Sequence, residues 1–125
     1  MLNIFNRKNK KPNADEQGLR IDFLQEEQWQ DLLDQSMNES VFLFKHSIRR
    51  GVSSMVLRRF EKQMRERNKN YYFLNILANR DLSNWIADEL NIRHESPKLI
   101  VLKEAKVIAY DSHYNLLDIS KEILV

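Results

Sequence analysis

Cysteine is absent from this chain of 125 residues. Its absence excludes disulfide bonds, thiolate metal sites and any reaction in which a protein thiolate attacks a disulfide. No apolar run reaches the roughly eighteen residues that a membrane-spanning helix needs. The first residues, 1–8, lack the apolar stretch of a secretory signal, and we therefore expect the protein to stay in the cytoplasm.

Glycine and proline are scarce, with two of each, and no repeat or low-complexity segment occurs. The length, with 42% hydrophobic and 30% charged residues, is typical of one soluble globular domain. The beginning of the chain differs, because it is polar and clusters the cations Arg7, Lys8, Lys10 and Lys11. We predict a flexible basic N-terminal tail over 1–18 and a folded domain over 19–125.

Charge is unevenly distributed along the chain, although the formal net charge is only +2. Residues 45–69 hold nine Lys and Arg against two Glu, whereas residues 19–44 hold one Arg against six acids. The net charge is too small to imply a polyanion partner, but the segments predict separate basic and acidic regions on the surface.

Apolar periodicity predicts alternating strands and helices. The strands are expected at 19–23, 40–44, 71–77, 99–102 and 107–110. The helices are expected at about 25–37, 53–69, 82–90 and 115–124. This order combines parallel crossovers with a final antiparallel hairpin, which favours an α/β fold with a central mixed sheet and helices on both faces. It is the order of a thioredoxin-like fold.

Apolar residues also indicate which parts of these elements are buried. The runs at 40–44 and 71–77 are continuously apolar, as expected for strands covered on both faces. The long helix carries a stripe that we expect to face the core, made of Val52, Met55, Val56, Phe60 and Met64. Residues 103–106 join the last two strands and lack the usual Asn-Gly of a tight hairpin.

The junction between the second strand and the long helix reads Lys45-His46-Ser47-Ile48-Arg49-Arg50-Gly51-Val52-Ser53. Here the chain resembles the YtxJ-type monothiol bacilliredoxins, thioredoxin-like redox proteins of the bacillithiol system. The resemblance runs from about Leu19 to Leu124. Its strongest stretches are Phe44 to Ser47, Ser53-Ser54, Leu82 to Ala87 and Arg93 to Lys98.

The resemblance implies a catalytic cysteine that this chain lacks. In the family pattern the cysteine falls on Arg50 and the following serine on Ser53. The resemblance implies an enzyme that removes bacillithiol from mixed disulfides, in which the N-terminus of a helix lowers the pKa of the cysteine thiol. A guanidinium is a permanent cation and cannot attack a disulfide. We therefore assign no catalytic residue and expect this chain to be inactive in thiol-disulfide exchange.

The same junction can instead bind an anion. Backbone N–H groups at a helix N-terminus favour a negative charge, and a guanidinium adds bidentate donors. The resemblance also implies a cis proline at Ser96-Pro97, facing this junction. Our first hypothesis is a redox-silent module that binds an anionic thiol metabolite such as bacillithiol, or a protein segment. The binding residues we predict are Lys45, His46, Ser47, Arg49, Arg50, Ser53, Ser96 and Pro97.

Three alternatives remain open. In one, Arg49 and Arg50 are solvated loop residues that bind nothing. In another, the chain is a genuine bacilliredoxin whose cysteine has been substituted by Arg50. In the third, the basic helix 53–69 is a surface that contacts nucleic acid or protein, although the missing aromatic interleaving favours a solvated face over nucleic acid.

The three histidines do not point to a metal or a hydrolase. His46, His94 and His113 belong to separate segments, and none has a second ligand at helical spacing. We therefore predict no metal site and no cofactor, with bacillithiol only as a ligand implied by the resemblance. His46 could pair with Ser47 or Ser53, but the sequence identifies neither an orienting acid nor an oxyanion site.

Overall fold

A computed structural model describes residues 20–47, 51–93 and 95–124. The predicted tail over 1–18 and the residues Arg49, Arg50 and His94 lie outside the described residues. The side chain of Val52 also lies outside them.

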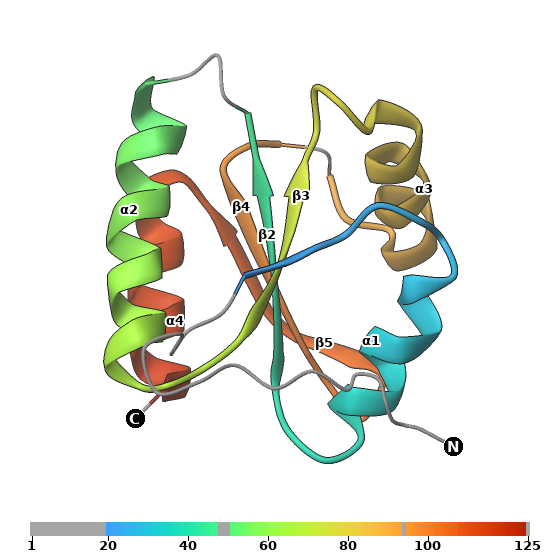
Figure 1. Ribbon diagram of the computed structural model, residues 1–125, viewed down its shortest axis with the longest axis horizontal. Helices are drawn as coiled ribbons and strands as arrows, with labels where there is room; N and C mark the ends of the chain where they lie inside the picture. Colours follow the sequence, from blue (N-terminus) through green and yellow to red (C-terminus); the bar gives the residue numbers. More distant parts are fainter. Residues whose placement is uncertain (1–19, 48–50, 94, 125) are drawn as a thin grey trace.

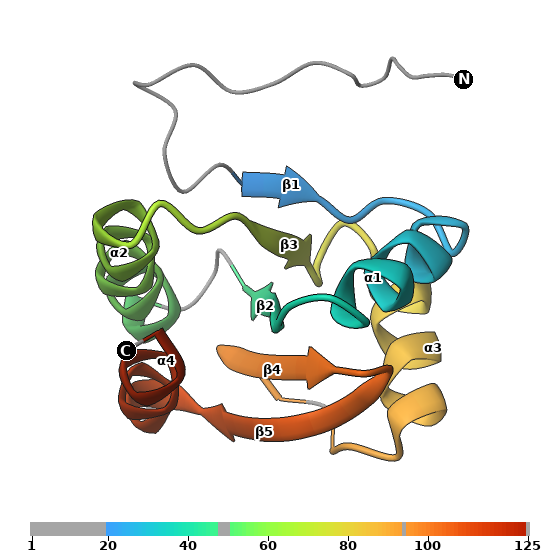
Figure 2. The ribbon, with the colours of Figure 1, turned by 90° about the horizontal axis from the view of Figure 1, so that it is seen from below.

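Five strands form one sheet in the order β1-β3-β2-β4-β5 (Figure 2). The strands are β1 (Arg20–Asp22), β2 (Val41–His46), β3 (Tyr71–Asn75), β4 (Lys98–Lys103) and β5 (Lys106–Ser112). Strands β1, β3 and β2 run parallel, and β4 and β5 are added antiparallel. The predicted mixed sheet is therefore confirmed, with β2 at its centre.

Helices cover both faces of this sheet (Figures 1 and 2). One face carries α1 (Gln28–Ser36) and α3 (Arg80–Leu90). The other carries α2 (Gly51–Glu66) and α4 (Leu116–Leu124), which the short 3-10 helix η2 (His113–Asn115) precedes. The α/β fold with helices on both faces is thus the one that the element order predicts.

The central strand β2 divides the hydrophobic core into two layers. All six of its residues are buried, and successive side chains point to opposite faces. Leu43 joins the layer under α1 and α3, whereas Phe44 joins the layer under α2 and α4. In the second layer the ring of Phe60 lies 5.0 Å from that of Phe44 and 5.1 Å from that of Tyr71. These aromatic contacts fix α2 against the sheet.

The prediction that Met55 belongs to the core is wrong, because 39% of this residue's surface is exposed. The inward face of α2 is instead formed by Ser53, Val56, Phe60 and Met64, which are fully buried. In an α-helix, Met55 points about 100° away from Val56. The apolar stripe predicted Met55 as the buried residue because Ser53 is polar. Ser53 faces the core instead, and its hydroxyl is hydrogen-bonded there to His46 and Ser47.

The hairpin between β4 and β5 turns without glycine. Glu104 and Ala105 adopt positive φ values of 54° and 61°, the left-handed conformation that Asn and Gly usually supply in such turns. Both residues are held by the end of α1: the Glu104 N–H donates to the Ser36 carbonyl at 2.6 Å, and the Ala105 N–H donates to Ser36 Oγ at 2.9 Å. Tertiary hydrogen bonds therefore replace the missing turn residues.

Candidate functional site

The candidate site lies at one end of the central strands, where β2 ends and where α2 and β4 begin (Figure 1). Lys45 of β2 pairs with Lys98 of β4 in an antiparallel register. Continuing that register by one residue places Pro97 beside His46. The Ser96-Pro97 peptide bond is cis, as the resemblance implies.

A buried serine fixes the start of α2 to the end of β2. Ser53 Oγ lies 2.7 Å from His46 Nδ1 and accepts the backbone N–H of Ser47 at 3.3 Å. Burial, reinforced by the Arg20 cation, lowers the pKa of His46, and the Glu61 carboxylate opposes the shift. The imidazole is therefore neutral at neutral pH, so its Nδ1 can accept the Ser53 hydroxyl while that oxygen accepts from Ser47.

The hydrogen bonds of Ser53 with His46 and Ser47 hold the backbone of this junction in position. Ser53 is 0% exposed and His46 is 4% exposed, so neither presents a nucleophile or base to a substrate. Within the described residues, no carboxylate makes a hydrogen bond to His46; Glu61 instead accepts the hydroxyl of Tyr71 at 2.6 Å. Of the two serine partners considered for His46 from the sequence, the structure selects Ser53, and the pair holds the N-terminus of α2 in place.

Lys45 does not join His46 and Ser53, because successive residues of a strand point to opposite faces. Its side chain is 1% exposed and its ammonium donates to the Ser83 carbonyl of α3 at 3.2 Å. Burial, followed by repulsion from the Lys98 ammonium, lowers the pKa of Lys45 to about 8. Lys98 is 2% exposed and pairs with Glu95 at 3.6 Å. Two buried cations therefore lie on the α3 side of the sheet.

The segment around the cis proline is anchored to η2 and β5. Pro97 is buried, and its carbonyl accepts the backbone N–H of His113 at 2.9 Å. Glu95 accepts the Ser112 hydroxyl at 2.6 Å, and that bond, more than the neighbouring Lys98, lowers the pKa of Glu95. Ser96 is half-buried and makes no backbone hydrogen bond with any other described residue. The described residues therefore leave the backbone groups of Ser96 unpaired.

Sequence reasoning missed two exposed residues on this side of the molecule. Tyr114 of η2 and Met55 of α2 are 46% and 39% exposed, and the Tyr114 hydroxyl lies 3.3 Å from the Met55 sulfur. They connect the first turns of α2 to η2, the element bonded to Pro97. The apolar stripe concealed this role, because it assigned Met55 to the core.

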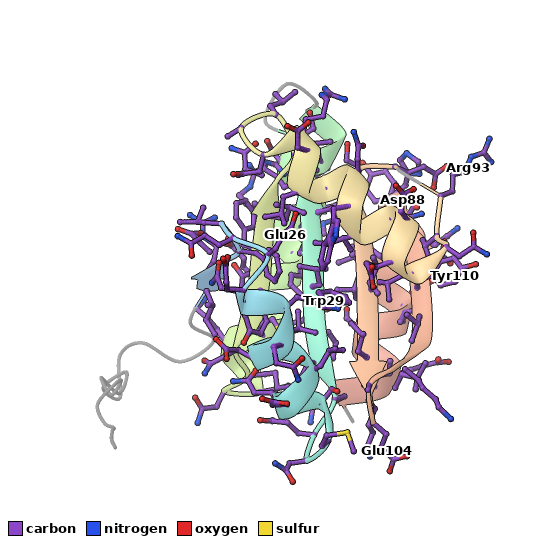
Figure 3. All side chains as sticks on the ribbon, turned by 90° about the vertical axis from the view of Figure 1, so that its right-hand side faces the viewer. Glu26, Trp29, Asp88, Arg93, Glu104 and Tyr110 are labelled. Atoms are coloured by element: carbon purple, nitrogen blue, oxygen red, sulfur yellow. The ribbon has the colours of Figure 1, made fainter. Side chains whose placement is uncertain are left out.

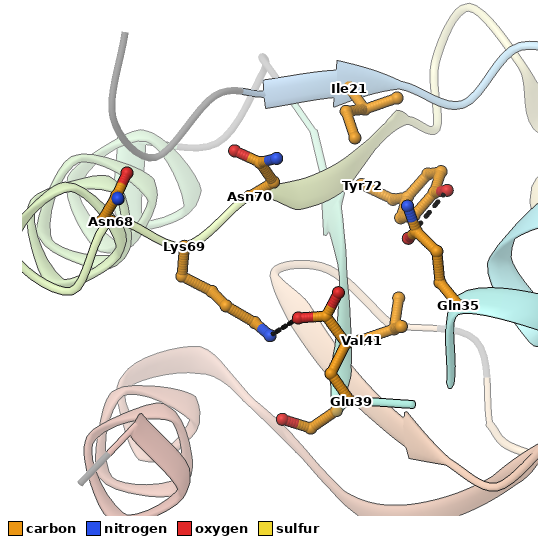
Figure 4. Close-up of a pocket in the computed structure, with 9 residues that line it drawn as sticks. Ile21, Gln35, Glu39, Val41, Asn68, Lys69, Asn70 and Tyr72 are labelled. Atoms are coloured by element: carbon orange, nitrogen blue, oxygen red, sulfur yellow. Dashed lines mark hydrogen bonds and ion pairs between the residues drawn. The ribbon is translucent and has the colours of Figure 1, made fainter. Parts of the chain in front are cut away.

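A small hollow of about 110 Å³ lies among α1, the end of α2 and the start of β3 (Figure 4). Its charged groups pair with each other: Lys69 Nζ lies 2.8 Å from Glu39 Oε1. The Tyr72 hydroxyl donates to Gln35 Oε1 at 3.2 Å, and burial raises the pKa of that hydroxyl to about 12. These bonds link α1 and its following loop to β3, which indicates a structural role.

The described residues contain no group of three or more His, Asp or Glu side chains arranged to hold a metal ion. Among the helices they form, none has the length and apolar character needed to cross a membrane.

Comparison with known proteins finds a family model that matches most of this chain. The family model described as monothiol bacilliredoxin BrxC matches residues 21–122. The match extends from β1 to α4 and includes the junction between β2 and α2, where this chain has no cysteine.

Solved structures agree on the fold. One, a thioredoxin-fold protein provisionally described as an oxidoreductase, is 28% identical with a TM-score of 0.73, covering 84% of this chain and 96% of its own. The thioredoxin of Trypanosoma brucei brucei is 14% identical with a TM-score of 0.69, covering 90% of this chain and 94% of its own. Thioredoxin f from spinach chloroplast is 19% identical with a TM-score of 0.68, covering 88% of each chain. At these identities the two thioredoxins show the fold alone.

Proposed function

Since the chain belongs to the monothiol bacilliredoxin family, we propose that it is a redox-silent binding module of that family. It binds an anionic thiol metabolite such as bacillithiol, or a segment of a protein, and does not react with it. Without cysteine the chain cannot form the mixed disulfide on which the chemistry of a thiol oxidoreductase depends. The proposed setting is the cytoplasm, where thiols are kept reduced.

The observation that carries the proposal is that the contacts that hold the start of α2 and the cis Ser96-Pro97 segment do not need a sulfur. Ser53, His46 and Ser47 hold the start of α2 through hydrogen bonds. Beside them the cis Ser96-Pro97 bond presents a peptide edge that the described residues leave unpaired. A helix N-terminus favours an anion, and a free peptide edge accepts an extended chain.

Arg49 and Arg50 supply the cationic part of the proposal through their place in the sequence. They come directly before Gly51, where α2 begins. A guanidinium can donate two parallel hydrogen bonds to a carboxylate, which suits the carboxylates of bacillithiol or of an acidic side chain.

The second candidate function is a genuine bacilliredoxin in which Arg50 has replaced the cysteine. The observation that favours it is Ser53, which the family pattern places three residues after the cysteine and which here keeps its buried position. In that reaction a thiolate at position 50 attacks the bacillithiol sulfur of a mixed disulfide. A disulfide forms between the enzyme and bacillithiol, and the client protein leaves as its thiolate.

One experiment separates these functions. The unmodified protein, Arg50→Cys and the control Arg49→Cys are each mixed with a bacillithiol mixed disulfide of a client protein, and the released client is measured. Binding of bacillithiol disulfide to the unmodified protein is followed by calorimetry in parallel.

We expect saturable binding without turnover for the unmodified protein, and turnover for Arg50→Cys alone. No saturable heat up to millimolar ligand would refute the binding module. If Arg50→Cys then still turned over, the second function would stand. Turnover by Arg49→Cys at the same rate would show that position 50 is not special.

A further inference from the structure

The two helical layers of the molecule carry opposite charge. The side with α1 and α3 exposes seven acids against Arg80, and the acids are Glu26, Glu27, Asp31, Asp34, Asp81, Asp88 and Glu89. Figure 3 looks onto this side, where Glu26 and Asp88 are labelled. On the opposite side, α2 exposes Arg58, Arg59, Lys62 and Arg65, and Arg67 directly follows the helix. On the same side, α4 exposes Lys121 together with Asp118 and Glu122. The net charge of +2 conceals this separation.

The carboxylates of α2 leave most of its cations unneutralised. The Glu61 carboxylate accepts the Tyr71 hydroxyl at 2.6 Å and lies 3.9 Å from the Arg20 guanidinium. It therefore interacts with residues of the sheet and not with the cations of α2. Glu66 pairs with Lys62 at 3.9 Å. In the part of the chain that the structure describes, none of the remaining cations on this side forms an ion pair; these are Arg58, Arg59, Arg65, Arg67 and Lys121.

Some of these unpaired cations border a hollow of about 340 Å³ between α2 and α4. It is lined by Arg59, Lys62, Gln63, Glu66, Arg67, Lys121 and Leu124. Gln63 connects the two helices, because its amide donates to the Leu117 carbonyl at 3.2 Å and its carbonyl oxygen accepts the Ser120 hydroxyl. We call this hollow the trough and its four lining cations, Arg59, Lys62, Arg67 and Lys121, the rim.

The spacing of the lining arginines along α2 indicates the length of an occupant. Residues 59 and 67 are separated by about 12 Å along the helix axis, at about 1.5 Å per residue. That length matches about four residues of an extended chain. We propose that the trough between α2 and α4 binds an acidic segment of a partner protein, in an extended conformation.

A nucleic acid fits these observations less well. Among the described residues that line the trough, none is aromatic, so it offers no stacking platform for bases. The four lining cations are gathered around one hollow together with the carboxylate of Glu66, whereas a duplex spreads its phosphates along a longer surface. An extended segment of about four acidic residues can instead place its carboxylates near these cations.

This surface is separate from the candidate site at the start of α2. It occupies the second half of α2 and the end of α4, whereas Ser53 lies in the first turn of α2. Loss of one site therefore leaves the other available, and the proposal does not rest on the proposed function.

The test uses the full chain and a fluorescein-labelled peptide with about four consecutive Asp and Glu residues, the length that the trough accommodates. The same peptide with Asn and Gln at those positions reports charge-independent binding. The variant Arg59→Gln/Arg67→Gln removes two rim cations. Its matched control, Arg58→Gln/Arg65→Gln, removes two exposed arginines of the same helix that do not line the trough.

We expect the rim variant to weaken binding of the acidic peptide by about tenfold and the control by about twofold or less. Equal weakening by both variants would overturn the proposal, because it would reflect overall charge. Absence of saturable binding by the acidic peptide would do the same. Tighter binding of a DNA duplex of about twenty base pairs, with the same dependence on the rim arginines, would assign the surface to nucleic acid instead.

Discussion

Replacing Lys45 by methionine should stabilise the protein at neutral pH. The residue is 1% exposed, and among the described residues its ammonium has one hydrogen-bond acceptor, the Ser83 carbonyl at 3.2 Å. Burial and then the Lys98 ammonium lower the pKa of Lys45 from 10.5 to about 8. Methionine has a similar shape and no charge, so Lys45→Met keeps the packing and removes the buried cation.

The size of the effect follows from the two pKa values. The difference between 10.5 and about 8, at about 1.4 kcal/mol per pKa unit, is a penalty of about 3 kcal/mol on the folded state. Loss of the bond to Ser83 costs about 1 kcal/mol. Lys45→Met should therefore raise the free energy of unfolding by about 2 kcal/mol at pH 7.

The sign of the pH dependence is fixed as well. Below pH 8 the lysine is protonated in both states, and the full penalty applies. Between about pH 8 and pH 10.5 the unfolded state binds more protons, so the stability of the unmodified protein rises and the penalty is lost. The advantage of Lys45→Met should fall across the same window.

Urea unfolding of both proteins from pH 7 to pH 10 measures this difference, and subtracting the two curves removes other titrating groups. Lys103→Met at the exposed end of β4 is the control and should give a difference that does not change with pH. If Lys45→Met were destabilising by the same amount at every pH, the reasoning would be refuted, because the hydrogen bond to Ser83 would then outweigh burial of the charge.

Two other substitutions test the local structure. Ser53→Ala removes the hydroxyl that joins His46 Nδ1 and the Ser47 N–H, leaving both buried groups unpaired, and should lower the free energy of unfolding by about 2 kcal/mol in urea denaturation. Ala105→Gly relieves a residue held at φ 61° and should raise the free energy of unfolding by about 0.5 to 1 kcal/mol, measured as a higher melting temperature.

Each of these substitutions has a control in the same structure. Ser54→Ala changes the half-buried neighbouring serine and should shift stability by less than about 0.5 kcal/mol; a loss equal to that of Ser53→Ala would contradict the bonding role. Ala87→Gly within α3 should destabilise by about 1 kcal/mol. If Ala105→Gly were destabilising too, strain at the turn would not be the governing effect.

Much of the fold could be predicted from the sequence, because apolar period and element order agree. The continuous apolar residues of β2 predict a strand buried on both faces, and all six of its residues are buried. The final hairpin predicts antiparallel strands beside a parallel sheet, and β4 and β5 occupy those places. Long, strongly patterned elements carry enough local information to be assigned without tertiary structure.

Features that depend on distant contacts could not be predicted. The turn at Glu104 and Ala105 is held by Ser36, which is far away in the chain. The inward position of Ser53 depends on His46, so a stripe counted from apolar residues alone chose Met55 instead. In the candidate site, grouping Lys45 with His46 overlooked the alternation of a strand, which sends their side chains to opposite faces.

The contacts that hold the candidate site together are distinct from the cysteine chemistry of the family. The start of α2 is fixed by Ser53 with His46 and Ser47, and the segment at Pro97 is fixed by His113. None of these contacts uses a sulfur, so they do not depend on a cysteine. The variant Arg50→Cys supplies a thiol but also removes one guanidinium of the proposed anion site. Turnover by this variant and binding by the unmodified chain therefore have to be measured separately.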